Sequence, residues 1–177
     1  MSVIYRVLAA VFFSIIGVSL SLAAPTASNE QVAVVGSLYK AFAWQALSSD
    51  DGIFGKSLAQ QDNAALRRYF DRELAALLVA DQRCVMQSGE VCNLDFDPIF
   101  ASQDPGAIDL SIRSTAPGIV SVEFTYPGNR EKIRLEYRLV KNDSQWRISD
   151  ISYPGNTKMS LKRMLAAGAH SGKPVRP

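Results

Sequence analysis

The run from residue 131 to residue 153, EKIRLEYRLVKNDSQWRISDISY, constrains the fold more than any other part of the chain. In its first half apolar side chains alternate with charged ones, which is the period-two pattern of a strand with one buried and one solvated face. The apolar members are Ile133, Leu135, Tyr137 and Leu139, and the charged members are Lys132, Arg134, Glu136 and Arg138. Asn142-Asp143 then supplies turn chemistry, so the run is predicted to form a β-hairpin.

The register of this hairpin decides which side chains face the core. If the loop closes symmetrically about Asn142-Asp143, Leu139 lies opposite Trp146. The same register places Tyr137 opposite Ile148, so apolar side chains meet across the two strands.

Asp150 is the anomaly of this arrangement, because the register places it opposite Leu135 on the core face. A carboxylate there needs hydrogen bonds, a cationic partner or a raised pKa. One alternative is a bulge near Ser149 and Asp150 that turns the chain. A bulge would also explain why Ile151 and Tyr153 take the other phase. The other alternative is that Asp150 points into an interior cavity and is a candidate ligand group.

Two further strands precede the hairpin. Their alternating apolar residues are Ile108, Leu110 and Ile112 in the first and Val120, Val122, Phe124 and Tyr126 in the second. A symmetric loop at residues 127–130 places Phe124 opposite Ile133, and the same register pairs Glu123 with Arg134. The sequence therefore predicts four antiparallel strands in a meander.

Helices are predicted before the strands and after them in the sequence. Ser28 and Gln31 form a capping-box pattern at the start of an amphipathic helix of about 18 residues. Asp62 caps a second helix that runs to about Ala80, and a short helix at about residues 159–167 follows the last strand. The expected fold class is α+β, with two N-terminal helices packed on a curved antiparallel meander sheet of about four strands and a short C-terminal helix.

Residues 1–23 are predicted to be a secretory signal peptide. Arg6 precedes an apolar run at residues 7–18, and the small residues Ser21 and Ala23 occupy the positions that cleavage after Ala23 requires. The alternative is an uncleaved membrane anchor. Cleavage predicts a protein without a stable membrane span in the periplasm or outside the cell.

The remaining sequence is predicted to form one domain, residues 24–170, with a flexible tail at residues 171–177. Cys84 and Cys92 are its two cysteines. In an oxidising compartment they are expected to form a structural disulfide. A redox pair would have CxxC spacing, and a zinc site would need more ligands.

The number and distribution of charged residues indicate which kinds of ligand the protein can bind. The formal net charge is +2 at pH 7 and no block of basic residues occurs, so nucleic-acid binding is not expected. Arg67, Arg68 and Arg72 are interleaved with Asp71 and Glu73, and we interpret them as a solvated face.

Three carboxylates, Asp95, Asp97 and Asp104, gather in a short segment and could hold a hard cation such as calcium. The segment lacks the central glycine and later acidic ligand of an EF-hand loop. Turn formation and helix capping are therefore preferred, and neither a metal nor another cofactor is predicted.

Three motifs carry a resemblance to a known family. They are DFDP at residues 95–98 followed by Gln103-Asp104, RLEYRL at residues 134–139, and WRISDI at residues 146–151. With these motifs the chain resembles, over about residues 30–165, an uncharacterised family of exported bacterial proteins in the nuclear-transport-factor-like, cystatin-like α+β superfamily.

The resemblance implies a cone, in which a bent sheet wraps around helices and leaves a pocket between them. Some members of that superfamily are isomerases or dehydratases that use an Asp-His pair or an Asp base, and others are non-catalytic binding modules. The one histidine of this chain, His170, lies beyond the predicted C-terminal helix, among small and polar residues. General acid–base catalysis by histidine is therefore not expected.

The sequence favours a non-catalytic periplasmic binding protein, for example an immunity protein that neutralises a toxin. Its predicted partner surface is the solvated face of the sheet, Arg134, Arg138 and Arg147, where the predicted register brings Arg138 beside Arg147 and so favours an acidic partner.

The alternatives use the cone itself. A small ligand would contact the pocket candidates Asp150, Trp146, Asp95, Asp97 and Tyr39. A carboxylate-based hydrolase or isomerase would need Asp150 to face Asp95 or Asp97 across the pocket, with one acid neutral and the other ionised.

Overall fold

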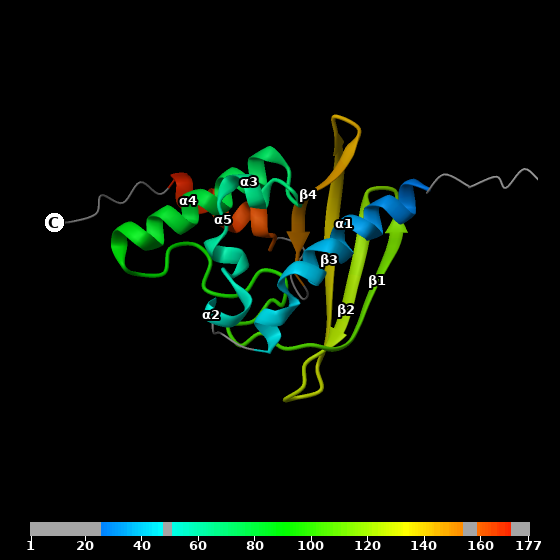
Figure 1. The fold of residues 1–177 in the computed structure, drawn as a ribbon, viewed down its shortest axis with the longest axis horizontal. Coiled ribbons are helices and arrows are strands. Elements are labelled where there is room, and N and C mark those ends of the chain that lie inside the picture. The colour runs from blue at the N-terminus through cyan, green and yellow to red at the C-terminus, as the bar shows by residue number, and fades with distance from the viewer. Residues whose placement is uncertain (1–25, 48–50, 154–158, 171–177) are drawn as a thin grey trace, which may run out of the picture.

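The computed structural model describes residues 26–47, 51–153 and 159–170, so the predicted signal peptide and tail lie outside the described residues. Its helical elements are α1 (Ala27–Phe42), η1 (Ala43–Ala46), α2 (Asp51–Phe54), η2 (Leu58–Gln60), α3 (Asn63–Leu66), α4 (Arg72–Ser88) and α5 (Leu161–His170). Its strands are β1 (Ile108–Ala116), β2 (Ile119–Thr125), β3 (Lys132–Asn142) and β4 (Gln145–Ser152). The strands form one curved sheet that α1 crosses, with α4 and α5 beyond β4 (Figure 1). This is the α+β fold that the sequence predicts.

Neighbouring strands pair antiparallel in chain order, as a meander does. The predicted register between β2 and β3 is confirmed, because Phe124 pairs with Ile133 and Glu123 with Arg134. Alternation of apolar and charged residues thus determines this pairing, since any slip by one residue would turn the apolar set to solvent.

The predicted register between β3 and β4 is wrong by two residues. Leu139 pairs with Ile148, and Trp146 pairs with Lys141. The loop residues are Asp143 and Ser144, with φ of 46° and 69°. Two-residue hairpin loops favour such left-handed backbone, which centres the turn one residue later than predicted.

The predicted bulge near Asp150 is present. The β3–β4 register shifts between Arg138 and Leu139. Leu139 pairs with Ile148, but Arg138 pairs with Asp150, so Ser149 has no partner residue on β3. The extra residue, Ser149, donates its hydroxyl to the Arg138 carbonyl at 3.2 Å. Beyond the bulge Ile151 is buried, as the change of phase in the sequence requires.

The prediction of one continuous second helix is wrong. Asp62 does cap a helix, α3, but that helix has four residues. Residues 69–71 then pair with the outer edge of β4, where the Ile148 amide donates to the Tyr69 carbonyl and the Asp71 amide donates to the Ile148 carbonyl. The interruption covers a sheet edge that would otherwise expose unpaired backbone groups.

Helix α4 starts where this edge pairing ends. Asp71 caps it by accepting from the Leu74 amide at 2.8 Å. The helix continues to Ser88, past the predicted end near Ala80, and Gly89 terminates it with a left-handed φ of 71°.

The predicted disulfide between Cys84 and Cys92 is present. It ties the end of α4 to the chain that returns toward the sheet. Asp81 reinforces this return, because its Oδ1 accepts from both the backbone amide and the side-chain amide of Asn93 at 2.9 Å. Disulfides are typical of proteins that fold in an oxidising compartment.

Candidate functional site

Residues 97–102 lie in the interior, where a cone would offer space to a ligand. Residues 97–102 form a closed turn, in which the Asp97 amide donates to the Ser102 carbonyl at 2.9 Å. Its two large apolar residues, Ile99 and Phe100, are 0% and 1% exposed. Phe100 lies edge-on between Tyr39 of α1 and Phe124 of β2, at ring distances of 6.0 Å from each. We call this segment the 97–102 turn.

Tyrosine hydroxyls hold the turn in place from three elements. Tyr39 donates to the Ile99 carbonyl at 2.6 Å, and Tyr153 donates to the Pro98 carbonyl at 3.2 Å. Tyr126 donates to the Phe100 carbonyl. Three successive carbonyls of a buried turn are thereby satisfied, which removes the cost of burying them unpaired.

A fourth tyrosine completes the cluster. Tyr137 of β3 is fully buried, and its hydroxyl lies 2.9 Å from that of Tyr39. Because the Tyr39 proton is used on the Ile99 carbonyl, Tyr137 is the donor of this bond. Burial raises the pKa of Tyr39, Tyr137 and Tyr153, so all three hydroxyls stay protonated and able to donate.

The Asp97 side chain binds backbone amides of the same turn, whereas the tyrosines bind its carbonyls. Its Oδ1 accepts from the amides of Ile99 and Phe100 at 2.9 and 3.2 Å, and its Oδ2 accepts from Gln45 Nε2 at 2.5 Å. Desolvation by burial outweighs these hydrogen bonds and raises the pKa of Asp97 to about 6. Asp97 and Tyr39, two of the predicted pocket residues, therefore both bind the backbone of the 97–102 turn.

The other predicted pocket residues lie elsewhere. Asp95 is exposed, and its Oδ2 lies at 3.5 Å from Gln103 Nε2. The Trp146 indole donates to Glu30 at 3.1 Å and so joins β4 to the start of α1. Among the described residues no three His, Cys, Asp or Glu side chains gather as metal ligands would.

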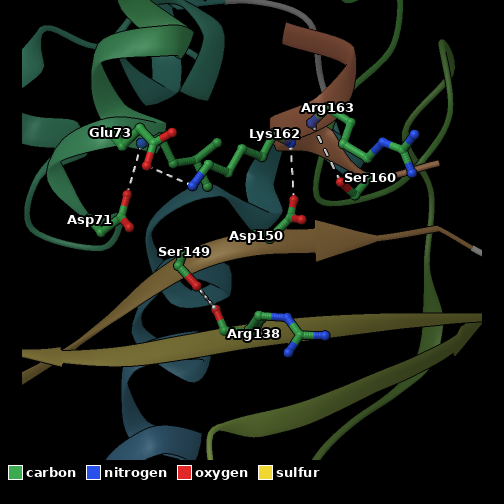
Figure 2. A network of polar contacts seen from close by, with 9 residues as sticks. Asp71, Glu73, Arg138, Ser149, Asp150, Ser160, Lys162 and Arg163 are labelled. Carbon is green, nitrogen blue, oxygen red and sulfur yellow. Dashed lines mark hydrogen bonds and ion pairs between the residues drawn. The ribbon is translucent and has the colours of Figure 1, made fainter. Parts of the chain in front are cut away.

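Asp150 holds the start of α5 (Figure 2). Its Oδ1 accepts from the amides of Ile151 and Lys162, at 2.9 and 3.0 Å, while Ser160 accepts from the Arg163 amide. Lys162 also forms an ion pair with Glu73 of α4 at 2.7 Å. The carboxylates of Asp150 and Asp97 therefore bind different parts of the backbone.

This geometry predicts a structural effect of mutating Asp150. Asp150→Ala removes an acceptor from the first turn of α5 and should lower the free energy of unfolding by about 1 kcal/mol. Asp150→Asn keeps the Oδ1 acceptor and should lower it less. Urea unfolding of both variants measures the difference, and an equal loss for the two would contradict the capping role.

A groove opens on the outside of the molecule, between the start of α4 and the tip of the β3–β4 hairpin. It encloses about 1040 Å³. Its lining residues are Asn63, Ala64, Arg67, Arg68, Phe70, Asp71, Arg72, Lys141, Asn142, Asp143, Gln145 and Arg147. Five of these are cationic and two are acidic, so we call it the basic groove.

The cations of the basic groove lack acidic partners. Within the described ranges of the chain, none of the five forms an ion pair with a carboxylate; the pairs found there are Arg113–Glu123, Arg134–Glu123 and Lys162–Glu73. Of the two acids, Asp71 is already the cap of α4. The groove is thus a concave region with an excess of positive charge.

Arg147 is held in the groove by neutral acceptors. Its Nε donates to the Arg67 carbonyl at 2.9 Å and its Nη1 to the Trp146 carbonyl at 2.8 Å, and its Nη2 donates to Gln145 Oε1. These bonds fix the guanidinium without neutralising its charge. A side chain ordered in this way binds an anion at a lower entropic cost.

The predicted pairing of Arg138 with Arg147 is wrong, because it rested on the wrong register. Arg147 pairs with Val140 and lines the basic groove, whereas Arg138 pairs with Asp150. Arg134 lies 3.7 Å from Glu123 and donates to Ser121 at 3.1 Å. Of the three predicted arginines, Arg147 lines the basic groove, and Arg134 and Arg138 do not.

Sequence reasoning missed the basic groove because its cations come from two distant segments. Arg67, Arg68 and Arg72 look like the solvated side of a helix when the helix is taken as continuous. The pairing of residues 69–71 with β4 brings them to the hairpin instead. The available signal was the spacing of Arg68 and Arg72, two like charges four residues apart that a continuous helix would disfavour.

Comparisons with known proteins do not assign this site. No protein-family model matches the chain, and no curated protein matches it. A solved structure to which it is similar is a protein of unknown function from Bacteroides thetaiotaomicron, with 22% identity over 71% of this chain and 90% of that chain and a TM-score of 0.47. The resemblance to the nuclear-transport-factor-like superfamily stays a prediction.

The helices in the described part of the chain are all too short or too polar to cross a bilayer.

Proposed function

We propose that the protein is a non-catalytic binding protein of the bacterial cell envelope, and that its basic groove binds an acidic segment of a protein partner. The observation that carries the proposal is the set of five groove cations without a carboxylate partner among the described residues. Such charges are stabilised when an acidic surface docks, and they also steer its approach.

A non-catalytic role fits the hydrogen bonding of the two predicted pocket acids, Asp97 and Asp150. Asp97 and Asp150 use their carboxylates on backbone amides of the protein itself. The one histidine of the sequence lies at position 170. A general base must reach a substrate proton, and these carboxylates are committed to internal donors.

A protein partner suits the groove better than a nucleic acid does. The formal net charge of the whole chain is +2, and two acidic side chains lie within the groove. Nucleic-acid sites usually show a more extended and more strongly basic surface.

The cellular setting supports a partner that arrives from outside or from the envelope. The signal-like residues 1–23 favour export, and the disulfide favours an oxidising compartment. An immunity protein that neutralises a toxin in the periplasm matches this setting, since inhibition needs a rigid binding surface and no catalytic group.

The proposal is tested by fluorescence anisotropy with a fluorescein-labelled glutamate-rich peptide. We expect Arg68→Glu/Arg72→Glu to weaken its binding at least about tenfold, because the substitutions reverse two groove charges. Position 72 lies in the first turn of α4, where glutamate suits the helix dipole, and Arg68 is exposed, so folding should be retained.

Arg134→Glu/Arg138→Glu is the matched control, since it changes the net charge equally on the sheet face. Its binding should stay within about twofold of the wild type. Equal weakening by both pairs, or no binding of the peptide by the wild type, would contradict the proposal.

A further inference from the structure

A smaller pocket adjoins the basic groove through a shared residue. It encloses about 220 Å³ and is lined by Ala41, Phe42, Trp44, Phe54, Lys56, Gln61, Ala65, Arg68 and Tyr69. Arg68 lines this pocket and the basic groove alike. An extended ligand in the groove can therefore continue past Arg68 into this pocket, which we call the aromatic pocket.

Two aromatic pairs form its walls. Trp44 and Phe54 stack with centroids 5.4 Å apart and planes at 16°, and Phe42 meets Tyr69 edge-on at 5.7 Å. The first pair brings η1 and α2 together, and the second joins the end of α1 to the turn before α4. Aromatic rings in such arrangements form rigid walls with little conformational freedom to lose on binding.

Phe54 of the pocket, and two apolar residues close in sequence to its aromatic pair, stay exposed to solvent. Phe54 is 47% exposed although it stacks on Trp44, and its neighbour Ile53 is 71% exposed. Leu47, which follows η1, is 81% exposed. Exposed apolar side chains that gather beside charged ones are typical of protein-binding surfaces.

We infer that the aromatic pocket receives one bulky apolar side chain, preferably aromatic, from the same acidic segment that binds in the basic groove. This inference rests on the proposed function and adds the nature of the partner segment, which is a run of acidic residues flanked by an apolar anchor. The anchor lies between the rings of the pocket, while Arg68 and Lys56 at its rim bind carboxylates of the adjoining residues.

Size and charge favour this occupant. A pocket of about 220 Å³ lies below the usual range for small-molecule sites and suits a single side chain. Hot spots of protein interfaces commonly place one aromatic anchor in such a pocket, beside charged residues that contribute less. The two cations on its lining select a segment that also carries negative charge.

The test compares two fluorescein-labelled peptides that differ at one position. Both are glutamate-rich, and one carries tryptophan where the other carries alanine. We expect the tryptophan peptide to bind the wild-type protein about tenfold more tightly or better, as a buried anchor does. Phe54→Ala should abolish this gain.

Met86→Ala is the matched control, because Met86 is an exposed apolar residue on α4 outside both cavities, with 70% of its side chain accessible. It should preserve the full gain. Equal binding of the two peptides would overturn the inference and leave the proposed function standing. A gain that persists in Phe54→Ala would overturn the inference as well, and failure of both peptides to bind would overturn both proposals.

Discussion

Replacing Phe100 by alanine is expected to lower the free energy of unfolding by about 3 to 5 kcal/mol. The side chain is 1% exposed and lies between Tyr39 and Phe124, so its removal leaves a cavity under the sheet. The hydroxyls that bind the backbone of the 97–102 turn cannot fill this space without breaking their own hydrogen bonds.

Phe54→Ala is the matched control for this prediction. It deletes the same atoms from a ring that is 47% exposed and stacks on Trp44 alone among the described aromatic rings. Its cost should be about 1 kcal/mol, because much of that ring is already hydrated. Chemical denaturation of both variants gives the comparison. A loss below about 1 kcal/mol for Phe100→Ala would mean that the 97–102 turn is not part of the core.

Asp97 should make the protein less stable as the pH rises from about 4 to about 6. Burial raises the pKa of Asp97 from 3.8 to about 6 in the folded protein. Between these values the folded state retains a proton that the unfolded state has lost, so raising the pH favours unfolding. The decrease in the free energy of unfolding should be about 2 to 3 kcal/mol across this window, and it should level off above it.

Two asparagine variants test the origin of this pH dependence. Asp97→Asn removes the titrating group, so its free energy of unfolding should change much less between pH 4 and pH 7. Asp95→Asn, at an exposed site two residues away, should keep the wild-type slope. Urea unfolding at several pH values provides the measurement. A wild-type slope in Asp97→Asn would assign the pH dependence to another group.

At pH 7 Asp97→Asn should also be less stable than the wild type, in which Asp97 is mostly ionised and accepts from Gln45. The Leu58 amide donates to Gln45 Oε1 at 2.6 Å, which directs Gln45 Nε2 toward Asp97. An asparagine at position 97 can still accept from the Ile99 and Phe100 amides. Its own amide group would then meet that of Gln45, and two donors face each other.

The strands and their order could be predicted from the sequence because the alternation of apolar and charged residues allows few strand registers. Between β2 and β3 apolar residues face one side and charged residues the other, so one register satisfies both faces. The β3–β4 register depended on the turn instead. Asn142-Asp143 looked like the loop centre, but the backbone places its left-handed residues at Asp143 and Ser144.

The elements that the sequence did not reveal depend on contacts between distant residues. The break before α4 exists because residues 69–71 pair with β4, and nothing in their local propensity requires it. The 97–102 turn enters the core because one tyrosine from α1 and the tyrosines that directly follow β2 and β4 supply donors for its carbonyls. The surrounding segment, residues 95–104, has three aspartates and two phenylalanines and looks locally like an exposed loop.

Because of the 97–102 turn and the break before α4, the candidate site lies at the edge of the sheet and not on its inner face, where the sequence predicts it. The 97–102 turn fills the interior, where the predicted pocket residues Asp97 and Tyr39 become supports of the turn. The break before α4 assembles the basic groove, and Arg147 is the one predicted partner residue that lines it. Binding is therefore proposed on the outer surface.

Capture of the natural partner by matched variants tests the central claim most directly. The oxidised wild-type protein, Arg68→Glu/Arg72→Glu and Arg134→Glu/Arg138→Glu would each be incubated with envelope and culture extracts, cross-linked and analysed by mass spectrometry. We predict one protein in stoichiometric amount with the wild type and with the sheet-face pair, and its loss with the groove pair. Capture of the same protein by the groove pair, or its loss only with the sheet-face pair, would contradict binding in the basic groove.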